Sequence, residues 1–172
     1  MPDTLHVLFL CTGNSCRSQM AEGWARALGG GTVAVESAGI EAHGKNPRAI
    51  AVMAEAGVDI SGQESTVVDD AMLRRADVVV TVCGHADELC PALPPTARKI
   101  HWPLTDPARA TGSEDQILAA FRDTRDEVER RVRKLLAEFP EQGAGYEGGA
   151  VSPQAKKCPP NAVAPSVLRE RK

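Results

Sequence analysis

The sequence predicts an α/β fold with a central parallel four-stranded sheet flanked by helices. Short apolar or β-branched runs alternate along the chain with segments whose apolar residues recur at helical spacing. The first run is almost continuously apolar, as expected for a strand that is buried on both faces of a parallel sheet. The length of 172 residues is that of one ordinary domain.

The first predicted unit is a strand, a loop and a helix. Residues 5–10 form the apolar run, and the polar loop after them leads into a helix whose apolar positions extend to Leu28. Three glycines at residues 29–31 end this helix. Residues 32–36 predict the second strand.

The middle of the chain adds one helix and two strands. Asn46 and Pro47 begin a helix that Gly57 ends. Residues 76–82 are β-branched and apolar and predict the third strand. Residues 99–104 predict the fourth strand.

A long helix follows the last strand. Ser113 and Gln116 form a capping box at its start, and we expect the helix to end near Phe139. Its apolar face consists of Leu118, Phe121, Val128, Val132, Leu135 and Phe139.

The composition changes after this helix. We predict a folded domain over residues 1–139. Residues 140–172 are rich in proline and glycine, carry more basic than acidic side chains and have no apolar period. This composition predicts a disordered basic tail.

The composition also excludes two classes of partner. The net charge is −3, and only 3% of the residues are aromatic, which argues against nucleic acid binding. The longest apolar runs, such as residues 78–82, are too short to span a membrane. The N-terminus lacks the basic region and cleavage site of a secretory signal, so we expect a cytoplasmic protein. No sequence feature favours self-association, and we expect a monomer.

The cysteines point to chemistry at their thiols. Their number is odd, and no export signal accompanies them, which argues against a structural disulfide framework. Redox, metal or nucleophilic roles therefore need to be considered. The five cysteines are Cys11, Cys16, Cys83, Cys90 and Cys158.

The loop after the first strand predicts an oxyanion site. It lies at the carboxyl end of a strand, where α/β sheets bind ligands, and it leads into a helix N-terminus. Small residues allow backbone N–H groups to converge on an anion, and Arg17 adds a planar fork for two oxygens of a tetrahedral oxyanion. The predicted oxyanion-binding residues are Thr12, Gly13, Asn14, Ser15, Cys16 and Arg17.

The same environment favours the thiolate of Cys11. The helix dipole, the Ser18 hydroxyl and Arg17 all stabilise an anionic sulfur, so we predict that Cys11 is a nucleophile beneath the bound oxyanion. The structural alternative is a tight turn with a buried cysteine and an exposed arginine. Cys16 falls in the first helical turn, where packing is the simpler role.

These residues carry a family resemblance. The segment from Cys11 to Ser18 resembles the phosphate loop of the low-molecular-weight protein tyrosine phosphatases and of the thioredoxin-coupled arsenate reductases, which share one fold. The likeness extends over about residues 5–139. The Asp106-Pro107 pair resembles the loop that carries the general acid in both families, which implies that Asp106 is the proton donor.

The fate of the covalent adduct distinguishes the two activities. A phosphatase lets water attack the phosphocysteine, whereas reduction of arsenate needs two electrons, which a second thiol can supply. Cys83 directly follows the third predicted strand, and Cys90 lies seven residues later. The resemblance implies that Cys11 attacks arsenate, that Cys83 attacks Cys11 and releases arsenite, and that Cys90 resolves the resulting bond. It also implies that thioredoxin reduces the Cys83–Cys90 disulfide.

This relay predicts a movable segment. If residues 84–89 are helical, Cys83 and Cys90 are about 10 Å apart along the axis, whereas a disulfide requires Cα atoms within about 7 Å. The segment must therefore unwind. Gly84 at its start and Pro91 after its end make so short a helix marginal.

Other interpretations remain open at this point. A low-molecular-weight protein tyrosine phosphatase would place aromatic walls near Asp106, but the residues after Pro107 are Ala108, Arg109, Ala110 and Thr111. A thiolate metal sensor is a third alternative, although the cysteine spacings match no zinc knuckle, and we predict no metal among the cysteines. Two packed core cysteines are the structural alternative for Cys83 and Cys90.

The resemblance also raises a potassium site beside the loop. Asn14, Glu22 and Ser37 match its ligands, but Thr66 stands where an aspartate is expected. We therefore predict no obligatory cofactor, with potassium as a possible ion, thioredoxin as the source of reducing equivalents, and phosphate or sulfate as competing oxyanions.

Overall fold

The computed structural model describes residues 4–139 and contains one parallel sheet. The strand order is β2-β1-β3-β4, which confirms the predicted fold class. The strands are β1 (Leu5–Cys11), β2 (Val33–Gly39), β3 (Val78–Thr81) and β4 (Arg98–His101). The predicted tail at residues 140–172 lies outside the described residues.

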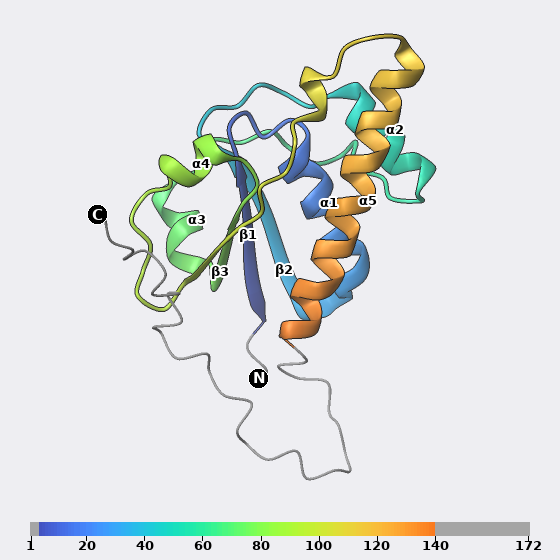
Figure 1. Ribbon diagram of the computed structural model, residues 1–172. Helices are drawn as coiled ribbons and strands as arrows, with labels where there is room; N and C mark the ends of the chain where they lie inside the picture. Colours follow the sequence, from blue (N-terminus) through green and yellow to red (C-terminus); the bar gives the residue numbers. More distant parts are fainter. Residues whose placement is uncertain (1–3, 140–172) are drawn as a thin grey trace, which may run out of the picture.

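Helices cover both faces of the sheet (Figure 1). On one side α1 and α2 pack against the long helix α5, and on the other side α3 and α4 lie against β1 and β3. The helices are α1 (Arg17–Gly29), α2 (Pro47–Glu55), α3 (Asp70–Arg75), α4 (Gly84–Glu88) and α5 (Glu114–Glu138), with 3₁₀ turns η1 (Gly30–Thr32) and η2 (Pro107–Arg109). Within residues 4–139 no helix has the length and apolarity needed to cross a bilayer.

The predicted helix boundaries are confirmed by capping interactions. The Asn46 side chain accepts hydrogen bonds from the backbone N–H groups of Arg48 and Ala49 at the start of α2. Gly57, after this helix, has a φ of 83°, a conformation that favours glycine. Ser113 and Gln116 form the expected capping box of α5.

The strand boundaries differ from the prediction because pairing across the sheet decides them. β2 continues to Gly39, since its backbone stays in register with β1 as far as Cys11. β3 and β4 are shorter than predicted because they pair over only four residues, from Val78 opposite Arg98 to Thr81 opposite His101. Helix α3 was not predicted, because its six residues are too few to show a helical period.

The core lies between the sheet and the two helical layers. β1 is buried over its last five residues, which explains why its sequence is continuously apolar. The largest fully buried side chains include Phe9, Phe121, Leu8, Leu10, Met20 and Met53. This core fixes the carboxyl ends of β1 and β3 side by side.

Candidate active site

The loop from β1 to α1 is held in shape by Asn14. Its φ of 47° lies in the left-handed region, which asparagine tolerates better than most residues. The Asn14 side chain donates to the hydroxyls of Ser18 and Ser37 at 2.8 and 2.9 Å and accepts from the Thr66 backbone N–H at 2.8 Å. The loop geometry is therefore fixed before any ligand binds.

Cys11 lies at the base of this loop with two hydrogen-bond partners. Its Sγ is 2.8 Å from the Ser18 hydroxyl and accepts the Asn14 backbone N–H at 3.1 Å. Because Ser18 already accepts a hydrogen from Asn14, its own hydrogen is free to point at the sulfur. Both donors stabilise an anionic sulfur, as a nucleophile at this position requires.

Close packing explains the glycine in the loop. A Cβ on Gly13 would lie 2.2 Å from Nδ1 of His43, so no larger residue fits without displacing this ring. The backbone N–H groups of Glu41 and His43 donate to the Thr12 and Gly13 carbonyls at 2.8 Å. The segment after β2 therefore supports the loop from one side.

Arg17 and Asp106 meet at the mouth of the loop. One Arg17 nitrogen donates to the Leu104 carbonyl at 3.1 Å, and another lies 3.4 Å from an Asp106 carboxylate oxygen. The second Asp106 oxygen accepts the Ala108 backbone N–H at 3.0 Å, which caps η2. The Asp-Pro segment thus orients the arginine and places a carboxyl group beside the predicted anion site.

Cys83 lies at the same edge of the sheet as Cys11. It follows β3, the neighbour of β1, and its Sγ is 3.3 Å from the Thr12 hydroxyl. It also accepts the Ala86 backbone N–H at 3.4 Å and caps α4. Cys90 follows α4 and is half-buried, and burial raises the pKa of its thiol.

Cys16 is a packed thiol. It is buried in the core cluster, and this burial raises its pKa to about 11. At neutral pH the thiol is therefore protonated. Its backbone still belongs to the predicted oxyanion loop.

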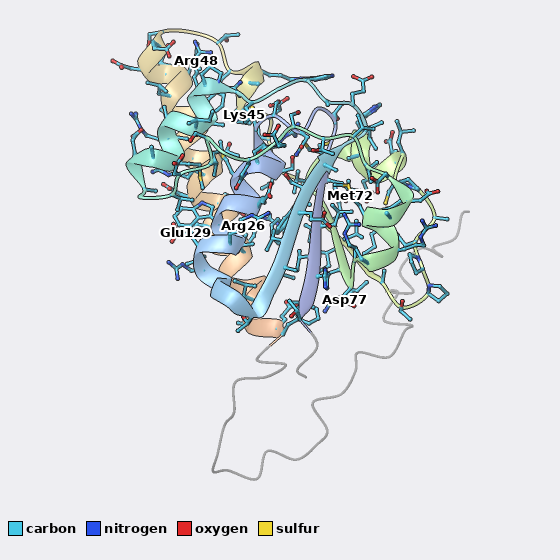
Figure 2. The ribbon with its side chains drawn as sticks, turned by 180° about the vertical axis from the view of Figure 1, so that it is seen from behind. Arg26, Lys45, Arg48, Met72, Asp77 and Glu129 are labelled. Atoms are coloured by element: carbon cyan, nitrogen blue, oxygen red, sulfur yellow. The ribbon has the colours of Figure 1, made fainter. Side chains whose placement is uncertain are left out.

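The predicted potassium ligands lie close together, but they form hydrogen bonds with one another. Ser37 donates to one carboxylate oxygen of Glu22 at 2.6 Å, and Asn14 donates to Ser37. The other Glu22 oxygen accepts from Arg26 at 2.7 Å, and Arg26 also donates to the Val35 carbonyl. Figure 2 shows Arg26 on α1. Because a guanidinium already neutralises Glu22, these residues do not fit a cation site.

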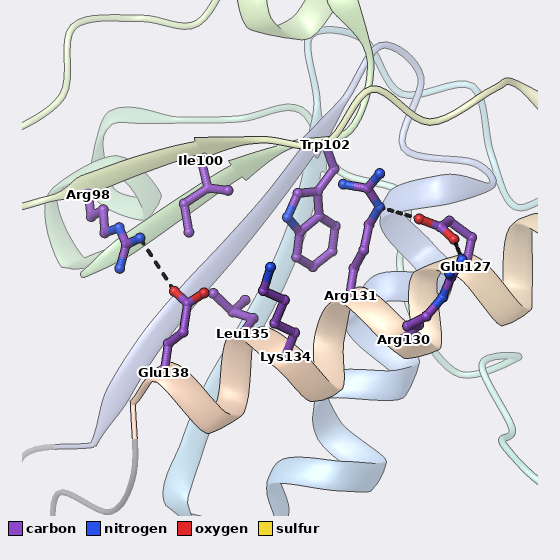
Figure 3. Close-up of a pocket in the computed structure, with 9 residues that line it drawn as sticks. All are labelled: Arg98, Ile100, Trp102, Glu127, Arg130, Arg131, Lys134, Leu135 and Glu138. Carbon is purple, nitrogen blue, oxygen red and sulfur yellow. Dashed lines mark hydrogen bonds and ion pairs between the residues drawn. The ribbon is translucent and has the colours of Figure 1, made fainter. Parts of the chain in front are cut away.

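Residues 4–139 contain no cluster of three histidine, cysteine, aspartate or glutamate side chains placed to hold a metal ion. A groove of about 420 Å³ lies between β4 and α5 and is lined by charged side chains, Trp102 and two aliphatic residues (Figure 3). None of the predicted site residues lines it.

The sequence of this chain matches the model of the low molecular weight phosphotyrosine protein phosphatase family over residues 6–144. The chain belongs to this family.

Within the family, its similar relatives include arsenate reductases. The chain is 52% identical to the arsenate reductase of Halalkalibacterium halodurans over 127 residues, which is 74% of this chain and 91% of that protein. It is 52% identical to the arsenate reductase of Bacillus subtilis over 137 residues, which is 80% of this chain and 96% of that protein.

Solved structures give the same picture of the fold. An arsenate reductase in a phosphate-binding state has a TM-score of 0.65 at 41% identity, with 78% of this chain and 98% of that chain covered. A tyrosine phosphatase from Erwinia amylovora has a TM-score of 0.67 at 20% identity, with 78% and 93% covered, and this likeness shows the fold alone.

Two site residues of this phosphatase-family chain were missed from the sequence. Gln19 is buried on α1. Its side-chain amide donates to the backbone carbonyls of Asn14 and Glu64 at 3.0 and 2.8 Å, and these bonds stabilise the loop. A polar residue beside the apolar positions of α1 was the available signal. The signal for Arg26 was its position four residues after Glu22 on the same helix, which is the spacing of an intrahelical ion pair.

Proposed function

We propose that this protein reduces arsenate to arsenite through a relay of Cys11, Cys83 and Cys90, with thioredoxin restoring the thiols. The observation that carries the proposal is the 3.3 Å distance between the Cys83 sulfur and Thr12, which puts a second thiol at the rim of the oxyanion loop. The relatives named arsenate reductase support the choice of substrate.

The first step uses the oxyanion loop. Its backbone N–H groups and Arg17 bind the arsenate oxygens, and phosphate and sulfate compete because they have the same tetrahedral shape. The Cys11 thiolate attacks arsenic, a sulfur–arsenic bond forms and an arsenic–oxygen bond breaks. Asp106 protonates the oxygen that leaves, in keeping with its position at the mouth of the loop.

The second step transfers the electrons. The Cys83 thiolate attacks the Cys11 sulfur, and the electron pair of the sulfur–arsenic bond stays with arsenic, which leaves as arsenite. Cys90 then attacks the Cys83 sulfur, so that Cys11 leaves as a thiolate and a Cys83–Cys90 disulfide remains. A thioredoxin dithiol reduces this bond and is itself oxidised.

The product assay tests this proposal. Purified protein with thioredoxin, thioredoxin reductase and NADPH is expected to form arsenite continuously from arsenate. After one turnover without thioredoxin, peptide mapping is expected to locate the new disulfide at Cys83–Cys90. Fully reduced thiols at both positions after arsenite has formed would contradict the relay.

The same protein samples also test the alternative that the protein is a tyrosine phosphatase. Phosphotyrosine binding favours aromatic walls, whereas Ala108, Arg109 and Ala110 follow Pro107, and Arg109 is 89% exposed. We expect phosphotyrosine hydrolysis to be slower than arsenate reduction under matched conditions. Faster hydrolysis would reverse the order of the two activities.

Potassium independence is expected from the Arg26–Glu22 ion pair. Because the guanidinium supplies the charge that a cation would bring, arsenite formation in potassium and sodium buffers of equal ionic strength should agree within about twofold. An increase of about tenfold or more that is specific to potassium would show that the ion binds despite Arg26.

A further inference from the structure

A polar cluster connects helix α4 to the sheet. We call it the Asp87 cluster, and it is formed by Thr81, Asp87, Lys99 and His101. Asp87 Oδ1 accepts from the Thr81 hydroxyl and from Lys99 Nζ, each at 2.9 Å. Lys99 Nζ also donates to the Asp87 backbone carbonyl at 3.0 Å. His101 Nδ1 lies 2.9 Å from the Thr81 hydroxyl oxygen and 3.7 Å from Asp87 Oδ1.

The sheet register explains why these side chains meet. Thr81 of β3 pairs with His101 of β4, and Lys99 lies two residues before His101, so all three project from the same face. Helix α4 covers this face and presents Asp87 to it. The cluster therefore connects Asp87, near the C-terminal end of α4, to two strands through both its side chain and its main-chain carbonyl.

This cluster lies within the segment that the relay must deform. Asp87 is between Cys83 and Cys90. Helix α4 covers five of the six residues between them, and a helix that extended over the whole segment would separate its ends by about 10 Å. A disulfide requires Cα atoms within about 7 Å, so α4 cannot stay intact when the two sulfurs bond. Unwinding the segment moves the Asp87 backbone and breaks its contacts with Thr81 and Lys99.

The other anchors of α4 are few. The helix has five residues, which is too short to be stable by its own hydrogen bonds. Its start is capped by the Cys83 sulfur, and Ala86 is its buried side chain. When Cys83 bonds to Cys11, its sulfur moves away from the Ala86 N–H, and the Asp87 cluster becomes the main polar attachment of the helix.

We propose that the Asp87 cluster is a latch that stabilises the reduced, helical form of α4 and thereby sets how readily Cys83 and Cys90 form their disulfide. Asp87 and Lys99 are positioning residues in this scheme, because they touch neither the oxyanion nor the reacting sulfurs. The inference rests on the proposed relay. It assigns a role to charged residues outside the oxyanion loop.

The charges in the cluster agree with this role. The hydrogen bond from Lys99 lowers the pKa of Asp87, and the Thr81 hydroxyl acts in the same direction, so the carboxylate is ionised at neutral pH. Burial raises the pKa of the Cys90 thiol in the helical form, while the charge of Lys99 lowers this pKa and that of Asp87 raises it by less. Unwinding removes the burial, which is the largest of these effects, and so favours the Cys90 thiolate as it comes within reach of Cys83.

The equilibrium between dithiol and disulfide tests the latch. The full chain is equilibrated with dithiothreitol buffers, and the Cys83–Cys90 bond is quantified by mass spectrometry after thiol trapping. Asp87→Asn keeps the side-chain shape but removes the charge. This variant is expected to raise the equilibrium constant for forming the disulfide by about tenfold, which corresponds to a reduction potential about 30 mV more negative.

Two further variants make the test specific. Glu88→Gln removes the same charge from an exposed neighbour on α4 and is expected to change the equilibrium by less than about twofold. Lys99→Met is expected to shift the dithiol–disulfide equilibrium in the same direction as Asp87→Asn. The double variant is expected to shift this equilibrium by less than the product of the two single effects. An Asp87→Asn equilibrium within about twofold of Glu88→Gln would overturn the latch.

Hydrogen exchange adds a readout of the reduced state. In reduced Asp87→Asn the amides of α4 are expected to exchange faster, whereas those of β1 keep their protection. Equal protection of α4 in both proteins would contradict the latch.

Failure of the latch can be distinguished from failure of the proposed function, because the dithiol–disulfide equilibrium is measured without arsenate. Absence of arsenite with a normal Asp87 effect would refute only arsenate reduction. A Cys83–Cys90 disulfide that forms under no condition would refute both the relay and the latch.

Discussion

Replacing Cys83 with serine is expected to abolish arsenite formation, with a loss of at least about 100-fold in the rate coupled to thioredoxin. A serine hydroxyl cannot attack the Cys11 sulfur and form a disulfide, so the electrons never reach arsenic. Serine is also a good N-cap, so it replaces the contact that the Cys83 sulfur makes with the Ala86 N–H. The loss therefore reports sulfur chemistry and not a damaged helix.

Arsenite release is measured directly, together with the number of free thiols after exposure to arsenate. The wild-type chain is expected to lose two thiols, and Cys83→Ser none. Cys158→Ser serves as the matched control, because the relay does not include this cysteine, and its rate should equal that of the wild type. Arsenite formation by Cys83→Ser at more than about a tenth of the wild-type rate would show that another thiol supplies the electrons.

Replacing Cys11 with serine is expected to remove all turnover while the oxyanion site survives. The hydroxyl keeps contacts with Ser18 and the Asn14 N–H, but it is not ionised at neutral pH and cannot form the arsenic adduct. The rate should fall by at least about 1000-fold. Phosphate should bind at least as tightly as in the wild type, because the serine hydroxyl places no negative charge beneath the dianion.

Calorimetric titration with phosphate and the arsenite assay check these two expectations on the same preparation. The combination matters, because loss of turnover alone would also follow from a collapsed loop. Turnover above about one per cent of the wild-type rate would exclude Cys11 as the nucleophile. Loss of phosphate binding with normal folding would mean that the sulfur itself organises the loop.

The two substitutions separate the parts of the relay. Cys11 belongs to the predicted anion site, whose loop Asn14 and Gln19 hold in place. Cys83 caps a short helix that changes shape in the proposed relay. The proposed relay thus combines a rigid binding loop with a movable reducing segment at one edge of the sheet.

Local patterns in the sequence were sufficient for the fold class and most elements. The apolar run of β1, the glycines after α1 and the capping box of α5 each depend on neighbours within a few residues, which a sequence displays directly. The loop between β1 and α1 could also be singled out as a candidate oxyanion site, because its small residues, arginine and following helix are contiguous. Helix α3 was missed because six residues show no period.

Contacts between distant segments were decided by the tertiary structure. The sequence does not state that β1 lies beside β3, and only this strand order brings the Cys83 sulfur to Thr12, 71 residues away in the chain. The pairing of Arg17 with Asp106 has the same origin.

The sequence by itself determined where the thiols and most of the strands and helices lie along the chain, because short-range sterics and hydrophobic periodicity act between near neighbours. The tertiary structure alone decided that Ser37 donates to Glu22 and that Asp87 attaches α4 to Thr81 and Lys99. Such contacts depend on strand order, register and the packing of helices onto the sheet. These are properties of the whole chain, so no local pattern contains them.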